Sequence, residues 1–186
     1  LSEPEQTILY WLAIKREWTT VSTLVADIVP TLTRITLLES LESLTWRALI
    51  EQQSGQYTLQ PVLMEYVTDR LIQQLTTELL SLDIVLFRQY ALLKTTVLNY
   101  IGESQRRIVL APLAKRIQAS FHNPQALQQH FQNLLQQLRD RPSTFFSYGA
   151  GNLINLALQL QLDLTGYDFS YCKIRNSNYI SSRHSK

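Results

Sequence analysis

Apolar residues recur at the spacing of an α-helix through most of this 186-residue chain, and this periodicity constrains the fold more than any other feature. The three clearest stripes are Leu37, Leu41, Leu44 and Ala48; Leu110, Leu113, Ile117 and Phe121; and Leu127, Phe131, Leu134 and Leu138. From Pro61 onward the pattern predicts helices at about 61 to 80, 84 to 101, 103 to 120, 124 to 140 and 149 to 161. We therefore expect a mainly α protein in which residues 61 to 161 form a helical array, with the second and third stripes in its core.

The first 60 residues combine helices with one β-hairpin. Ser2 and Glu5 form a capping box, which predicts a helix over about residues 3 to 16. A β-prone link, a short helix and a longer helix follow. Two β-prone runs then flank Ser54-Gly55, which is a typical two-residue hairpin turn. This order is that of a winged helix-turn-helix domain at residues 1 to 60, whose last helix continues to about residue 81.

The distribution of charge argues against DNA as the partner of such a domain. The chain carries +2 overall, but residues 1 to 81 hold five Lys and Arg against ten Asp and Glu, a net charge of −5. The remainder carries +7. The helix that would read DNA holds Arg34 and Arg47 but also Glu39 and Glu42, so it is neutral, whereas affinity for DNA comes largely from cations that neutralise phosphates. A nucleic-acid-binding regulator stays an alternative, and docking to protein is the expectation.

Four cations gather in the predicted helix at 103 to 120, namely Arg106, Arg107, Lys115 and Arg116. Two interpretations stay open. The cations form a solvated face, or they form a patch that docks on an acidic surface such as the front domain or an upstream ATPase. No aromatic side chains alternate with these cations, as stacking on RNA bases would require, so RNA is a third and weaker option.

The sequence contains no arrangement typical of a catalytic or metal site. It has no G-x-x-x-x-G-K-[ST] motif to cradle a triphosphate, and it has only five Gly. His122, His130 and Cys172 lack the spacing of metal ligands, and Ser, Cys and His are too scattered to nominate a nucleophile and base. No run reaches the roughly 18 to 20 apolar residues of a membrane span. We expect a non-enzymatic cytoplasmic protein without a metal.

Residues 162 to 181 follow a step of five instead of helical spacing. Leu164, Phe169, Ile174 and Tyr179 fall on this step, and Asp or Asn precedes three of them. The pattern resembles the pentapeptide repeat, in which every fifth side chain points into a narrow β-coil. A single coil cannot bury its own apolar face, because repeat architectures are stabilised by stacking on neighbours. We expect 162 to 181 to open a repeat domain, 182 to 186 to be a tail, and the chain to be part of a longer protein.

The segment QYTLQPVLMEYVTDRLIQQL, residues 56 to 75, resembles the end of the winged-helix domain in NB-ARC ATPases. In those families a Met/Leu-His-Asp triplet enters the helix, followed by an apolar residue and an acidic-aromatic pair. Here Leu59-Gln60-Pro61 falls on the triplet, Val62 on the apolar position and Glu65-Tyr66 on the pair. This segment and the later segment GNLINLALQLQLDLTGYDFS are similar in sequence to bacterial, chiefly cyanobacterial, NB-ARC proteins that end in WD-repeat propellers or pentapeptide repeats. The resemblance covers about residues 8 to 179.

The resemblance implies a regulatory connecting segment of a STAND-type signalling ATPase. It implies an upstream NB-ARC domain that binds ADP or ATP, and a downstream repeat domain, as intramolecular partners. In the family the triplet His points to the ADP phosphates, and Gln60 takes that position here. An amide can donate a hydrogen bond but cannot carry a positive charge, so nucleotide sensing through Gln60 would not depend on pH near neutrality. A stand-alone adaptor that binds peptides in helical grooves is a further alternative.

Overall fold

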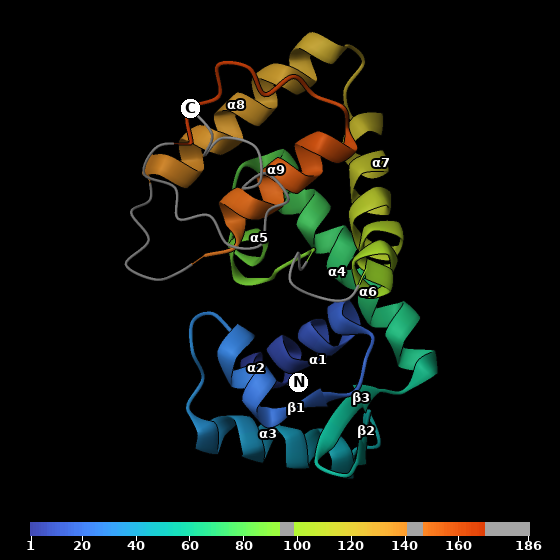
Figure 1. The fold of residues 1–186 in the computed structure, drawn as a ribbon. Helices are drawn as coiled ribbons and strands as arrows, with labels where there is room; N and C mark the ends of the chain where they lie inside the picture. Colours follow the sequence, from blue (N-terminus) through green and yellow to red (C-terminus); the bar gives the residue numbers. More distant parts are fainter. Residues whose placement is uncertain (94–98, 141–146, 170–186) are drawn as a thin grey trace. The chain divides into compact units, whose positions relative to one another are not determined.

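The computed structural model of the chain describes residues 1–93, 99–140 and 147–169 and is mainly α-helical, as predicted (Figure 1). The chain divides into two compact units, Leu1–Gln73 and Gln74–Lys186, which we name the front unit and the rear unit. The division falls inside the long helix α4 (Pro61–Ser81). The sequence places a domain boundary at residue 60 and continues the last helix of the front domain to about residue 81.

The front unit contains three helices, a three-stranded sheet and the first turns of α4. In chain order these are α1 (Glu3–Lys15), β1 (Thr19–Thr20), α2 (Val21–Asp27), α3 (Arg34–Trp46), β2 (Ile50–Gln53) and β3 (Gln56–Leu59). The sheet is antiparallel in the order β1-β3-β2. Ser54 and Gly55 both have positive φ, as a type I′ turn requires, and they join β2 to β3 in a tight hairpin. The order of the elements is the one expected from the sequence.

Helix α1 is the centre of the front unit. Every residue from Ile8 to Ile14 is buried, and α1 contacts both α3 and β3. The predicted capping box is present, because the Ser2 N–H donates to Glu5 Oε2 at 2.7 Å and the Glu5 N–H donates to Ser2 Oγ. The inner face of α3 buries Leu37, Leu41 and Leu44 from the predicted stripe, whereas the fourth member, Ala48, lies in a turn beyond the end of α3 and is exposed.

Among its described residues, the rear unit contains helices joined by loops and no β-strand. After the last turns of α4 it contains α5 (Leu86–Gln89), α6 (Asn99–Gln105), the π-helix η1 (Arg106–Leu110), α7 (Ala111–Ala119), α8 (Pro124–Asp140) and α9 (Gly149–Gln159). Helix α9 is buried from Gly149 to Ala157, and α5, α7, α8 and η1 all pack on it (Figure 1). The predicted stripe of Leu127, Phe131, Leu134 and Leu138 on α8 is buried against this core.

The predicted continuous helix at 84 to 101 is wrong. Only the four residues of α5 are helical before Tyr90, where the backbone is extended with φ −116° and ψ 137°, and α6 begins at Asn99. Between residues 84 and 93, where the structure describes side chains, six residues are buried on no single helical face: Ile84, Phe87, Tyr90, Ala91, Leu92 and Leu93. Apolar side chains can be buried in the core from helical and from extended backbone alike. Their periodicity therefore could not reveal the break.

A π-turn interrupts the predicted helix at 103 to 120. The Ala111 N–H donates to the Arg106 carbonyl, five residues back, in place of the usual four. Pro112 supplies the physical reason. Its nitrogen has no hydrogen to donate, and its ring would clash with the carbonyl four residues earlier in a regular helix.

Candidate functional site

Gln60 lies between β3 and α4, at the position that the resemblance singles out. It is half-buried, and its carbonyl accepts the N–H groups of Leu63 and Met64, both at 3.0 Å. Pro61 occupies the first turn, where the missing N–H is harmless. The backbone of Gln60 therefore starts α4, and Val62 in that turn is 84% exposed.

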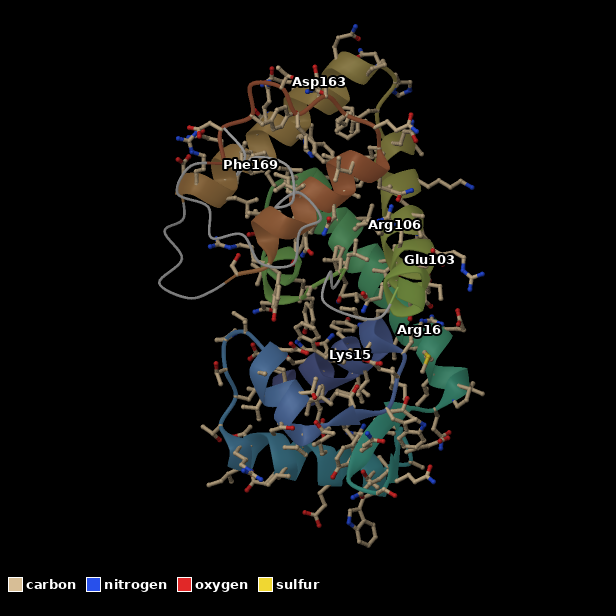
Figure 2. All side chains as sticks on the ribbon, viewed as in Figure 1. Lys15, Arg16, Glu103, Arg106, Asp163 and Phe169 are labelled. Carbon is tan, nitrogen blue, oxygen red and sulfur yellow. The ribbon has the colours of Figure 1, made fainter. Side chains whose placement is uncertain are left out.

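Arg16 anchors the beginning of α4 to the end of α1. Figure 2 shows Lys15 and Arg16 at the end of α1, where Arg16 takes the left-handed conformation with φ 52°. Arg16 Nη1 donates to Glu65 Oε1 at 3.1 Å, and Arg16 Nη2 donates to the buried Thr68 Oγ1 at 3.2 Å. Glu65, the acidic member of the acidic-aromatic pair, is thus half of an ion pair. Sequence analysis missed Arg16, because no local pattern marks a contact across 49 positions.

Glu5 joins the start of α1 to the end of α3. Its side chain is almost fully buried, with the residue 7% exposed, and its Oε1 accepts the Ser43 hydroxyl at 2.6 Å. Arg47 Nη1 lies 3.3 Å from Oε2. The Ser43 hydroxyl, the Ser2 N–H and the Arg47 guanidinium lower the pKa of Glu5 and outweigh the opposing effect of burial. The carboxylate is therefore held in its ionised form.

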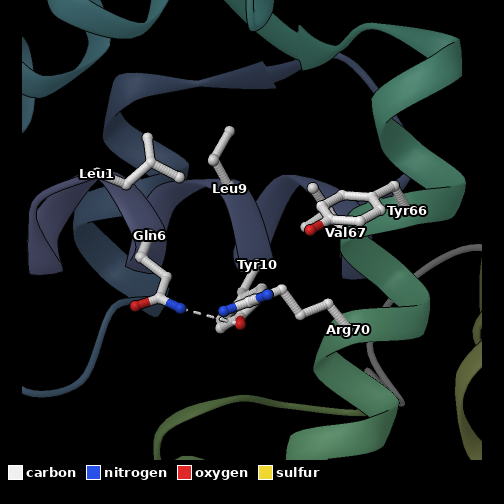
Figure 3. A pocket seen from close by; sticks show the side chains of 7 residues that line it. All are labelled: Leu1, Gln6, Leu9, Tyr10, Tyr66, Val67 and Arg70. Carbon is white, nitrogen blue, oxygen red and sulfur yellow. Dashed lines mark hydrogen bonds between the residues drawn. The ribbon is translucent and has the colours of Figure 1, made fainter.

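A pocket of about 340 Å³ lies between α1 and the first turns of α4 in the front unit (Figure 3). Its lining residues are Leu1, Gln6, Leu9, Tyr10, Tyr66, Val67 and Arg70. Gln6 Nε2 donates to the Tyr10 hydroxyl at 3.0 Å, and Arg70 extends toward the two phenols. The phenol of Tyr66, and then that of Tyr10, raises the pKa of the Arg70 guanidinium. The lining offers hydrogen-bond donors on apolar walls, with no nucleophile beside a base.

The basic cluster lies on η1 and α7. Arg106, Arg107 and Lys115 are exposed, whereas Arg116 is half-buried and has an interaction partner. Figure 2 shows Arg106 close to Glu103, which is also exposed, on the α6–η1 stretch. Three of the four cations are thus accessible on one continuous helical segment.

The five-residue step is only partly within the described residues. Leu164 and Phe169 are half-buried, whereas Ile174 and Tyr179 lie outside the described residues, as does Cys172. Residues 164 to 167 form a turn in which the Tyr167 N–H donates to the Leu164 carbonyl and Gly166 has φ 83°. The segment is attached to α8, because Gln128 Nε2 donates to the Asp163 carbonyl and Arg139 pairs with Asp168 at 3.2 Å. The predicted β-coil itself stays a prediction.

Sequence analysis also missed a polar cluster in the core of the rear unit. The Asn152 side chain on α9 is buried, accepts the Leu92 N–H at 3.0 Å, and donates to the carbonyls of Phe87 and Tyr90 at 2.8 and 2.7 Å. The Glu78 carboxylate accepts the N–H groups of Leu86 and Phe87 and so caps α5. Burial raises the pKa of Glu78 more than these two hydrogen bonds lower it.

The described residues hold neither a cluster of metal ligands nor a helix that could span a membrane. Within 1–93, 99–140 and 147–169, no group of three or more His, Cys, Asp or Glu is placed to hold a metal ion. His130 Nε2 instead lies 2.8 Å from the Leu79 carbonyl. In the same residues, no helix has the length and apolar character needed to cross a bilayer.

Comparison with known proteins links the chain to a long repeat protein. It is 34% identical to an uncharacterized WD repeat-containing protein of Nostoc sp. (strain PCC 7120), a cyanobacterium, over 91% of its own length. The matched region is 16% of that relative, so the chain spans about a sixth of it. No family model and no solved structure matches the chain. The expected link to cyanobacterial WD-repeat proteins is confirmed by this similarity.

Proposed function

We propose that this chain is a non-catalytic connecting segment of a multidomain NB-ARC (STAND-type) signalling ATPase. It couples the nucleotide state of an upstream ATPase domain to a downstream sensor domain of WD repeats or pentapeptide repeats. The observation that carries the proposal is the match of nearly the whole chain to a small share of a WD repeat-containing protein. A segment of this size within a long repeat protein suits a connecting role.

The front unit supports the proposal through its topology and charge. Its order of elements, with β1 paired to β3 and a tight β2-β3 hairpin, agrees with the expected winged helix. The outer face of α3 exposes Glu39 and Glu42, which would repel DNA phosphates. We infer that this winged helix docks on protein, with the ATPase domain as its intramolecular partner.

The entry to α4 supports a route by which nucleotide state reaches the rest of the segment. By the resemblance, Gln60 takes the position of a phosphate-facing His in NB-ARC proteins, and its carbonyl accepts the first N–H groups of α4. A few residues on, Glu65 and Thr68 hold Arg16 at the end of α1. A displacement at Gln60 therefore acts on α4 and α1 together. The basic cluster of Arg106, Arg107 and Lys115 supplies an accessible docking patch for an acidic surface in the rear unit.

Sequencing the gene on both sides of this segment tests the proposal first. We expect a G-x-x-x-x-G-K-[ST] motif upstream, at the position of an ATPase domain, and WD or pentapeptide repeats downstream. An open reading frame that stops near both ends of the segment would rule the proposal out in favour of an independent protein.

Nucleotide release from the full-length parent tests the role of Gln60. Gln60→Ala should change the rate at which a fluorescent ADP analogue dissociates. Gln60→His should make that rate depend on pH between about 6 and 8, because only a histidine gains charge there. Gln53→Ala, at an exposed position of β2, is the control. Equal release rates for all variants would show that Gln60 does not sense nucleotide.

A further inference from the structure

Helix α3 carries apolar residues on its outer face as well as on its inner face. Leu37, Leu41 and Leu44 are buried in the front unit. On the outside, Trp46 is 83% exposed, Ile35 70% and Leu38 42%. A surface helix is usually polar on its outer side. Singly exposed apolar residues are common, but three large ones on one helix face form a patch, and such patches mark interaction sites.

The outer residues lie along one line of the helix. At 100° per residue, Ile35, Leu38, Glu42 and Trp46 fall within about 80° of one another, and Glu39 lies next to them. Ile35 and Trp46 are separated by about 16 Å along the axis, or three turns. The outer face therefore has apolar groups at both ends and the carboxylates of Glu39 and Glu42 between them, all exposed. Arg34 and Arg47 are exposed cations at the two ends of α3, and Arg47 pairs with Glu5.

This pattern selects the chemistry of the partner. Glu39 and Glu42 would repel the phosphates of a nucleic acid and an anionic membrane surface. The same carboxylates attract Lys or Arg, and an exposed Trp is the residue type that most often contributes strongly to a protein interface. A helix laid along α3 presents apolar groups and charges at matching intervals.

We propose that the outer face of α3 binds an amphipathic protein helix that carries apolar residues about three turns apart with Lys or Arg between them. Trp46 and Ile35 bury the apolar residues of the partner, and Glu39 and Glu42 pair with its cations. The inference rests on the proposed function, in which the front unit is a winged helix that docks on protein, and it assigns the docking surface to the outer face of α3.

Fluorescence anisotropy with two labelled peptides tests this proposal on the full chain. Both are helical peptides of about 18 residues, one built from Leu, Ala and Lys and the other with Glu in place of Lys. The Lys peptide should bind, and the Glu peptide should not. Trp46→Ala should weaken binding by about 10-fold or more. Glu39→Lys with Glu42→Lys should reverse the preference between the peptides.

Val62→Ser is the matched control, because Val62 is as exposed as Trp46 but lies on α4 in the same unit. This variant should bind the Lys peptide like the unaltered chain. Since Trp46 is exposed, Trp46→Ala should keep the melting temperature, so that lost binding is not lost folding. Equal binding of both peptides, binding unaffected by Trp46→Ala, or no binding would each overturn the proposal.

Analytical sedimentation of the chain alone tests whether a second copy of the chain occupies the outer face of α3. A dimer that dissociates on Trp46→Ala would assign the face to a second copy of the chain and would also overturn the proposal. The gene-sequencing experiment above does not depend on any of these results, so failure of this inference and failure of the proposed function remain distinguishable.

Discussion

Asn152 replaces, with one side chain, several hydrogen bonds that a helix through residues 84 to 101 would make internally. In such a helix the Leu92 N–H would donate to the Arg88 carbonyl. Here the Leu92 N–H donates to Asn152, and the Arg88 carbonyl accepts the Tyr148 N–H at 2.9 Å instead. Buried backbone groups must find partners, and both of these partners come from the beginning of α9 or just before it.

Asn152→Ala should destabilise the protein by about 2 to 4 kcal/mol, because it leaves one N–H and two carbonyls buried without their partner. Urea unfolding followed by circular dichroism measures the change. The matched control is Asn133→Ala on the exposed side of α8, which should cost less than about 0.5 kcal/mol. A loss at residue 152 as small as at residue 133 would mean that the 87–92 segment does not depend on this amide.

Glu5 and Glu78 should affect the pH dependence of stability in opposite directions. The pKa of Glu5 is lowered from 4.5, so its ionised form contributes stability that is present above about pH 4.5 and is lost as pH falls through the folded pKa. Glu5→Gln should therefore cost about 1 to 2 kcal/mol at neutral pH and less in acid.

The pKa of Glu78 is raised from 4.5, so the folded state holds that proton more tightly than the unfolded state does. The stability of the unaltered chain relative to Glu78→Gln should then fall as pH rises from about 4.5 through the folded pKa. Both trends are measured by the unfolding free energies of the unaltered chain, Glu5→Gln and Glu78→Gln, determined from about pH 3 to about pH 8. Parallel curves would contradict both assignments.

At the scale of elements, a buried ion pair joins the ends of α1 and α2. Lys15 Nζ lies 2.8 Å from Asp27 Oδ2, and the two side chains are only 2% and 10% exposed. Helix α2 is short and buries few side chains of its own, chiefly Leu24 and Asp27. Its position in the front unit therefore depends on this contact more than on an extended apolar face.

Asp27→Asn should destabilise the front unit by about 3 kcal/mol, because it removes the carboxylate from a buried ammonium group. Thermal unfolding measures the loss. The double variant Lys15→Met with Asp27→Leu should recover much of the stability, since replacing both charges by apolar groups removes the unpaired buried charge. An Asp27→Asn variant as stable as the unaltered chain would show that the pair behaves like a solvated surface pair.

At the scale of the whole molecule, the distribution of charge favours the hypothesis that the chain docks on protein over the hypothesis that it is a nucleic-acid-binding regulator. The −5 charge of residues 1 to 81 includes the exposed acids of α3, and the basic cluster of Arg106, Arg107, Lys115 and Arg116 lies on a segment without aromatic residues. We expect no binding of duplex or single-stranded oligonucleotides in fluorescence anisotropy, even at low salt. Binding that weakens steeply with salt would support the regulator.

The sequence by itself determined the elements whose signals are local. The capping box of Ser2 and Glu5 begins α1, the Ser54-Gly55 turn joins β2 to β3, and Pro61 and Pro124 begin α4 and α8. Each of these signals acts within a few residues, so one chain suffices to read it. The mainly α class and the buried stripes follow from the same local periodicity.

Only the tertiary structure decided where a local signal was absent or misleading. The break after α5 depends on Asn152, about sixty positions away, and the entry to α4 depends on Arg16, 49 positions from Glu65. Side chains that meet across such distances leave no periodic pattern, because their positions are related by packing and not by the pitch of a helix. The exposed apolar face of α3 belongs here too. Its spacing matches a buried face, and only the packing of the front unit determines which side of α3 remains free.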